Sequence, residues 1–269
     1  MEEAEAVVRH YETIDEERRL FDGPGRLELA RTQEILRRHL PAAPAQVLDV
    51  GGGPGTHAAW LAADGHRVHV VDLIASHVDT VRRTLGPAGV TAEVGDARGL
   101  SEPDSSVDVV LLLGPLYHLP AAADRRLALD QARRVLRPGG LVAVAGINRF
   151  ASLFDGLVRG FLFEPAFRAI VARDLADGRH ENPDDNPHWF TTAYFHRPEE
   201  LGSEVAAAGF DPVEVMGVEG LPGWLENCQA RWEDAEDRRV ILEAARCVES
   251  EPTLLGLSAH LLAVGRAPV

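Results

Sequence analysis

Apolar and polar positions follow a repeating order along most of this chain. Short apolar runs at residues 47–50, 67–72, 90–94, 107–113 and 141–147 predict strands that are buried on both faces. The segments between them, such as 76–85 and 122–136, space their apolar residues three or four apart, which predicts amphipathic helices. Further strands are predicted at 212–218 and 258–264, and helices at 198–208 and 234–248. This alternation predicts an α/β fold with a doubly wound, mostly parallel sheet.

Two segments depart from the alternation. Residues 1–45 have a helical pattern, clearest from Arg26 to Leu40, and predict an N-terminal helical segment. Residues 148–196 are far longer than an ordinary α/β connection of roughly 2–6 residues, which predicts an inserted helical cap or lid. The predicted organisation is an N-terminal segment at 1–45, a main domain at 46–147 and 197–269, and a cap at 148–196.

A glycine-rich turn follows the first predicted strand, in Asp49-Val-Gly-Gly-Gly-Pro-Gly-Thr56. Glycines at 51, 53 and 55 accept positive φ and allow a ligand to approach the backbone closely. A helix that begins near Thr56 directs its free amides at the same place. The turn therefore predicts a site for a nucleotide-like ligand; a glycine-rich connection without a ligand is the alternative.

Acidic residues end the next two predicted strands. Asp72 lies 23 residues beyond Asp49, and Asp96 follows the third strand in Gly95-Asp96-Ala97. Because the carboxyl ends of parallel strands meet at one edge of a sheet, we expect all three acids at that edge. In a nucleotide-binding βαβ unit, the acid at the position of Asp72 accepts hydrogen bonds from ribose hydroxyls.

Five stretches in this order resemble the motif series of the class I S-adenosylmethionine-dependent methyltransferases. They are Asp49-Val-Gly-Gly-Gly-Pro-Gly55, Asp72, Gly95-Asp-Ala97, Gly114-Pro-Leu-Tyr-His-Leu119 and Leu136-Arg-Pro-Gly-Gly140. The resemblance implies a Rossmann-like, seven-stranded, mostly parallel sheet whose antiparallel last strand enters between its two predecessors. It also implies S-adenosyl-L-methionine as cofactor and S-adenosyl-L-homocysteine as product.

The resemblance gives each matching position a role. It implies that Asp49 and the backbone of Gly51 and Gly53 hold the methionine end of the cofactor. It implies that Asp72 binds the ribose, that Leu73 packs on the adenine, and that Asp96 and the Ala97 amide bind the adenine edge. Residues from Leu113 to His118 would border the methyl acceptor. Tyr11 would reach the ligand if an N-terminal helix covers the glycine turn; a tyrosine at the rim of that helix is the alternative.

Catalytic residues have a weaker signal, because methyl transfer from a sulfonium depends mainly on alignment. His118 follows the fourth strand and is our candidate base, with capping of the next helix as the alternative. Tyr117 is its neighbour and a pocket-lining candidate. Arg149 follows the fifth strand and would pair with an anionic acceptor, with a solvated surface position as the alternative. The cap adds possible lid contacts at His180, His188, Trp189, Tyr194 and His196, each equally open to a packing or surface role.

The amino-acid composition limits the classes of molecule that this protein is expected to bind. Lys and Arg number 27 against 42 Asp and Glu, a formal charge of −15, which argues against nucleic acid and anionic membranes. No apolar run approaches the roughly 20 residues of a membrane span, and the first residues lack a leader pattern, so we expect a cytoplasmic protein. Histidines and cysteines lack zinc-site spacing, so no metal is expected.

We therefore predict an S-adenosylmethionine-dependent methyltransferase that acts on an oxygen, or a nitrogen, of a small molecule or modified peptide. Carbon stays open as the acceptor atom. An NAD-dependent Rossmann oxidoreductase is one alternative, although it requires G-x-G-x-x-G where this chain has G-x-G-x-G followed by Thr56. A non-catalytic protein that binds the same cofactor is the other.

Overall fold

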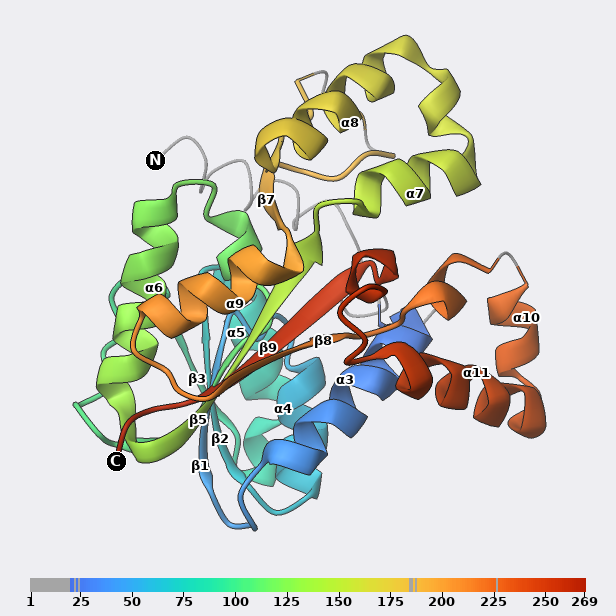
Figure 1. The fold of residues 1–269 in the computed structure, drawn as a ribbon. Helices are drawn as coiled ribbons and strands as arrows, with labels where there is room; N and C mark the ends of the chain where they lie inside the picture. Colours follow the sequence, from blue (N-terminus) through green and yellow to red (C-terminus); the bar gives the residue numbers. More distant parts are fainter. Residues whose placement is uncertain (1–19, 22, 24, 184–185, 187, 226) are drawn as a thin grey trace.

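The computed structural model describes residues 20–21, 23, 25–183, 186, 188–225 and 227–269, and the labels follow Figure 1. The strands are β1 Gln46–Val50, β2 Arg67–Asp72, β3 Thr91–Val94, β4 Val107–Leu112, β5 Leu136–Asn148, β6 Arg179–His180, β7 Ala193–His196, β8 Val213–Gly217 and β9 His260–Arg266. The α-helices are α3 Gly25–His39, α4 Thr56–Ala63, α5 Ala75–Thr84, α6 Ala122–Val135, α7 Ala151–Arg159, α8 Pro165–Asp177, α9 Pro198–Ala207, α10 Cys228–Trp232 and α11 Ala235–Val248. Short 3₁₀ turns are η1 Gly86–Ala88, η2 Leu116–His118, η3 Phe161–Phe163, η4 Leu221–Trp224 and η5 Leu255–Leu257.

The main sheet has the spatial order β3-β2-β1-β4-β5-β9-β8. The first five of these strands pair in parallel, whereas β9 is antiparallel to both β5 and β8 and lies between them. This confirms the predicted seven-stranded sheet with an antiparallel final strand. The sequence pattern did not predict β7, which pairs in parallel with the end of β5, or β6, which pairs with β7.

Apolar cores lie on both faces of the sheet. On one face α6 and α9 pack through residues such as Leu129 and Leu201, which are fully buried. On the other face α3, α4 and α5 pack through Ile35, Leu61 and Val78. Figure 1 shows these helices on either side of the sheet, and the parallel strands β1 to β5 place their carboxyl ends at one edge. Ligand sites in open α/β sheets form at such edges.

The cap region follows β5. It contains the helices α7 and α8, which stand beyond the edge of the sheet in Figure 1. Phe167 and Trp189 pack with Ile170 in the core of this region, so the aromatic residues fill its interior. Phe163, in contrast, is 76% exposed. The boundaries of the cap as a domain stay a prediction.

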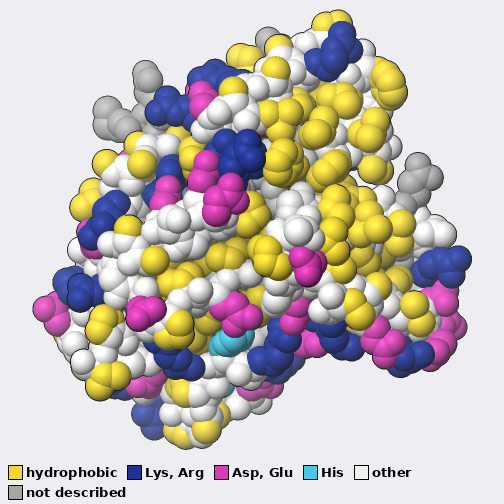
Figure 2. Space-filling view, viewed as in Figure 1, with side chains coloured by type: hydrophobic (Ala, Val, Ile, Leu, Met, Phe, Trp, Pro, Cys, Tyr) yellow, Lys and Arg dark blue, Asp and Glu magenta, His cyan; other side chains and the backbone are white. Residues whose placement is uncertain are grey.

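The surface in Figure 2 mixes Lys and Arg with Asp and Glu over α11, and hydrophobic side chains gather over α7 and η4. Exposed hydrophobic residues on or next to these elements are Leu157 on α7, Phe163 in η3, Leu221 in η4 and Leu225 directly after η4. Within the described part of the chain, the helices are all too short or too polar to span a bilayer.

Arg125 connects several elements from a fully buried position on α6. Its Nε and Nη2 donate to the Glu204 carboxylate on α9, at 2.9 and 2.6 Å, and Nη1 donates to the carbonyls of Leu119 and Pro120. The guanidinium also lies 3.7 Å from the centre of the Tyr194 ring on β7. One cation therefore ties α6, α9 and β7 together at the edge where the pocket opens.

Replacing this cation should destabilise the fold. Arg125→Met keeps much of the side-chain volume but leaves Glu204 and two carbonyls without their donor, so the free energy of unfolding should fall by about 2–4 kcal/mol. The matched control is Arg126→Met on the same helix, whose 52% exposed side chain pairs with Asp130; it should cost less than about 1 kcal/mol. Urea denaturation measures both, and equal losses would contradict the assignment.

Candidate active site

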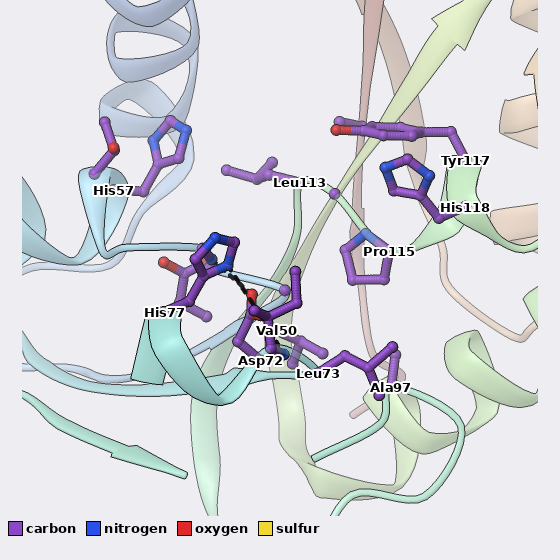
Figure 3. A pocket seen from close by; sticks show the side chains of 18 of the residues that line it. Val50, His57, Asp72, Leu73, His77, Ala97, Leu113, Pro115, Tyr117 and His118 are labelled. Atoms are coloured by element: carbon purple, nitrogen blue, oxygen red, sulfur yellow. Dashed lines mark hydrogen bonds and ion pairs between the residues drawn. The ribbon is translucent and has the colours of Figure 1, made fainter. Parts of the chain in front are cut away.

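A pocket opens at the carboxyl ends of the central strands. Its wall takes residues from the turns after β1, β2, β3 and β4, from β5 and β9, and from α3. Figure 3 shows Asp72, Leu73 and Ala97 at one end, Tyr117 and His118 at the other, and Leu113 between them. The sheet therefore brings together residues that are far apart in the sequence.

The glycine turn has the backbone expected from the sequence. Gly51, Gly53 and Gly55 have φ of 66°, 55° and 96°, which confirms their predicted conformation. A Cβ at Gly51 would lie 2.5 Å from the Pro115 ring, so only glycine fits there. A Cβ at Gly53 would meet nothing within 4 Å, which leaves open space above the turn. The turn therefore presents bare backbone to the pocket.

Asp49 lines this pocket with a side chain that is 1% exposed. Neither of its carboxylate oxygens has a hydrogen-bond partner among the described residues. Burial, with a smaller contribution from the nearby Asp72 carboxylate, raises the pKa of Asp49 to about 7. A buried carboxylate without a partner is suited to a ligand cation.

Asp72 ends β2 and supports the glycine turn. Its Oδ2 accepts from the Gly53 amide at 2.8 Å, and its Oδ1 accepts from the Ile74 amide at 2.9 Å. His77 on α5 places its Nδ1 3.3 Å from Oδ1 (Figure 3). Leu73, which is 40% exposed, and Ala97 line the same end of the pocket. This end combines a carboxylate with apolar surface, as a nucleoside requires.

Asp96 also lines the pocket, but a neighbouring cation already binds its carboxylate. The Arg98 side chain donates to both Asp96 oxygens, through Nε at 3.0 Å and Nη2 at 2.6 Å, and Nη1 reaches Asp124 at 3.0 Å. Hydrogen bonds from the Arg98 side chain lower the pKa of Asp96. Sequence reasoning missed Arg98, although it follows Asp96 by two residues. The role expected for Asp96 toward adenine stays a proposal.

Tyr117 and His118 lie in η2, directly after β4, and both line the pocket. The His118 ring stacks on Phe190 with centroids 5.8 Å apart, and Tyr117 meets His118 edge-on at 4.7 Å. Leu113, at the end of β4, lies beside them. The structure thus brings the three β4-side candidates to one end of the pocket.

Two positions were expected for Arg149, one that pairs with an anionic acceptor and one on the solvated surface, and both expectations were wrong. Its side chain is buried, it does not line the pocket, and it donates to the Phe195 carbonyl at 2.7 Å and to Glu200 at 2.6 Å. It is therefore an internal tie between β5, β7 and α9. Tyr11 lies outside the described residues.

The cap histidines also have interior or surface positions. His180 is buried and bonds Asp174 at 2.9 Å, and His196 is buried and bonds Glu204 at 3.3 Å. Burial lowers the pKa of His196. Trp189 packs in the cap core, and His188 is exposed. None of these side chains lines the described pocket.

Sequence reasoning missed a second group on the pocket wall. Glu28 and Thr32 face it from α3, and His260 and Leu262 face it from β9, with Val218 beside them. The residues on α3 are more than 180 positions before those on or after β8, so no local sequence motif could have identified this group. Glu28, Glu219 and His260 place possible ligand atoms within 4.8 Å of one another, a grouping that the sequence spacing did not predict.

Known proteins resemble the chain in this region. A family model described as a methyltransferase domain matches residues 47–140, from β1 to the start of β5. Methyltransferase GfsG from Streptomyces halstedii is 33% identical over 138 residues, which is 48% of this chain and 49% of that protein. A ubiquinone biosynthesis O-methyltransferase from Xylella fastidiosa is 28% identical over 194 residues, 70% of each chain. The chain carries a class I S-adenosylmethionine-dependent methyltransferase domain.

A solved structure supports the fold of this methyltransferase. The Burkholderia thailandensis 1,6-didemethyltoxoflavin-N1-methyltransferase, crystallised with 1,6-didemethyltoxoflavin and S-adenosylhomocysteine, superposes with a TM-score of 0.56. It is 19% identical and the match covers 90% of this chain and 79% of that chain. The matched segment of GfsG, in comparison, is about half of that protein, since it covers 49% of its length.

The cofactor of the methyltransferase is S-adenosylmethionine, and the pocket fits it. Asp49 offers a buried, unpaired carboxylate where a cationic amino group needs one. The space above Gly53 leaves room for the methionine end, and Asp72 with Leu73 would hold the nucleoside. These residue roles are proposals that binding measurements test.

Asp49 should make the stability of the cofactor-free enzyme depend on pH. Its folded pKa of about 7 lies above the ordinary value of 3.8, so the folded state holds an extra proton between these values and stability falls as pH rises through them. From pH 4 to pH 8 the wild type should lose about 2–4 kcal/mol more than Asp49→Asn does. Denaturation at both pH values measures this, and parallel pH profiles would disprove it.

Proposed function

We propose that this methyltransferase transfers a methyl group to the oxygen of a neutral hydroxyl on a small molecule. An amine nitrogen is the second acceptor atom that the sequence leaves open, and a modified peptide is the second acceptor class. The observation that carries the proposal is the charge of the pocket wall.

Acids dominate this wall. Glu28, Asp49, Asp72, Asp96 and Asp124 line it, and Arg98 is the one Lys or Arg among its described residues. The Arg98 guanidinium is already bonded to two of these carboxylates. Among the described wall residues no further Lys or Arg is available to an anionic acceptor, so a neutral or cationic acceptor fits better. This argues against the carboxylate acceptor for which Arg149 was considered.

The acceptor end of the pocket has a small-molecule character. Tyr117, Ala145, Val218 and Leu262 supply apolar surface, and His118 and His260 supply polar groups among them. Such a mixture is typical of small-molecule sites. The Xylella relative is named for O-methylation in ubiquinone biosynthesis, which supports oxygen as the acceptor atom. The formal charge of −15 supports the absence of a nucleic-acid partner.

Bound S-adenosylmethionine supplies a methyl group on a positively charged sulfur. The protein's part is to hold the acceptor in line with this methyl group and to exclude water. Asp49 and the glycine turn would fix the methionine end, and the β4-side residues Leu113 and Tyr117 would border the reacting atoms. Carbon stays open as the acceptor atom, and the cytoplasmic location expected from the sequence stays a prediction.

Ligand and acceptor choice can be tested together. Calorimetry should show binding of S-adenosylmethionine and no binding of NAD. Binding of NAD alone would contradict the proposal. With tritium-labelled cofactor, catechol should accept the methyl group, and benzoate, which presents only a carboxylate, should not. Methylation of benzoate in preference to catechol would contradict the charge argument.

Asp72→Ala should weaken cofactor binding by about 1–3 kcal/mol, which is roughly 5- to 150-fold in Kd, because it removes the carboxylate that supports Gly53 and faces the ribose. Asp79→Ala on α5 is the matched control, since that side chain is 74% exposed and outside the pocket. Calorimetric titration measures both. Unchanged affinity in Asp72→Ala would remove this residue from the site.

A further inference from the structure

His260 stands at the acceptor end of the pocket, at the start of β9. Strand alternation places it on the same face as Leu262, and both residues line the pocket. Across the β5–β9 ladder His260 pairs with Ile147 and Leu262 pairs with Ala145. Tyr117 packs on Ile147, so His260 and the β4-side residues flank the end of the same strand.

Glu219 holds the His260 ring. The ring Nδ1 donates to Glu219 Oε1 at 2.5 Å, and the His260 backbone amide donates to Oε2 at 3.0 Å. Ser258 also donates its hydroxyl to Oε2 at 3.0 Å, while accepting from the amides of Glu219 and Gly220. Glu219 is 4% exposed. A carboxylate can only accept at Nδ1, so the neutral ring carries its lone pair on Nε2.

The strand order places this pair beyond the methyl donor. The residues that would hold the cofactor follow β3, β2 and β1, and the sheet then continues through β4 and β5 to β9. Three strand spacings separate β1 from β9, roughly 14 Å at about 4.8 Å each. A small ring placed over Leu113 and Ala145 would lie between the methionine end of the cofactor and His260.

We propose that His260 is the general base of methyl transfer and that Glu219 is its positioning residue. This proposal rests on the proposed function, since a neutral hydroxyl must lose a proton. The acceptor hydroxyl gives its proton to Nε2, its oxygen bonds the methyl carbon, and the electron pair of the broken carbon–sulfur bond stays on sulfur. The products are a methyl ether, S-adenosylhomocysteine and an imidazolium that faces Glu219, with Glu28 Oε2 3.9 Å from Nδ1.

His118, the base expected from the sequence, has a different environment. Its ring packs against Phe190 and Tyr117, which suits it to contact the acceptor. Glu28, Glu219 and His260 also lie close enough to bind a metal ion. However, Glu219 Oε1 already accepts from His260 Nδ1, and Oε2 already accepts from Ser258 and the His260 amide, so a cation bound through Nδ1 and Oε1 would have to displace the hydrogen bond between the two side chains. The contacts therefore favour a base.

His260→Gln and Glu219→Gln test the proposal, with tritium-labelled S-adenosylmethionine and catechol as probes. His260→Gln should lower kcat about 100-fold or more and leave the Kd for the cofactor within about twofold. The wild type should show a rise of kcat/KM with pH as the proposed base loses its proton, and His260→Gln should abolish that rise. Glu219→Gln should lower kcat less and shift that rise, and His118→Ala should mainly raise KM.

The matched control is His69→Gln. His69 lies on β2 outside the pocket, is 31% exposed against 27% for His260, and also has two carboxylates, Glu93 and Glu102, within 4.0 Å. Its kcat and pH profile should equal those of the wild type. A loss of kcat in His118→Ala but not in His260→Gln would overturn the proposal, and so would loss of activity with a metal chelator.

Ring ¹⁵N NMR of the histidines gives a readout that needs no turnover. In the wild type with S-adenosylhomocysteine bound, the His260 signal, assigned by its loss in His260→Gln, should report the Nδ1–H tautomer, and Glu219→Gln should change it. An Nε2–H tautomer would overturn the proposal whether or not catechol is methylated. Absence of cofactor binding in the wild type would instead overturn the proposed function itself.

Discussion

The buried carboxylate of Asp49 is the constraint on which the site depends. Protein interiors rarely leave a carboxylate without a hydrogen-bond partner, because its desolvation costs several kcal/mol. Here β1 lies between β2 and β4, and the glycine turn folds directly against the carboxylate: a Cβ at Gly52 would lie 2.7 Å from its Oδ2. A cationic ligand can neutralise this group, which no cation among the described residues pairs with. The fold therefore retains an unfavourable group that binding satisfies.

The order of the strands sorts the pocket into two ends. The ends of β1 and β2 supply Asp49 and Asp72, and the turn after β3 supplies Asp96, at the cofactor end. Strands β5 and β9, with α3, supply Ala145, His260 and Glu28 at the other. Because β9 is antiparallel, its first residues rather than its last reach the carboxyl edge of β5. The antiparallel strand β9 thus places its first residue, His260, beside residues at the C-terminal ends of the parallel strands.

Buried arginines act as internal ties in this fold. Arg31 is fully buried on α3 and pairs with Glu34 and Glu249, as Arg125 and Arg149 pair with glutamates on α9. Their guanidinium groups satisfy carbonyls and carboxylates between layers, where a lysine would offer fewer fixed donors. The described pocket wall has acids, histidines and one arginine, Arg98, which already pairs with Asp96 and Asp124.

The features that the sequence by itself determined depend on interactions between residues that are near one another in the chain. The strands, the helices, the positive φ of Gly51, Gly53 and Gly55, and the pocket positions of Asp49, Asp72 and Asp96 follow from residue periodicity, chain chirality and the parallel sheet. Tertiary structure decided the rest. The pairing of β7 with β5, the burial of Arg149, and the contact of His260 with Glu219, 41 residues away, depend on which distant segments meet. Residue spacing does not encode those contacts, because they arise only when the distant strands have paired into the sheet.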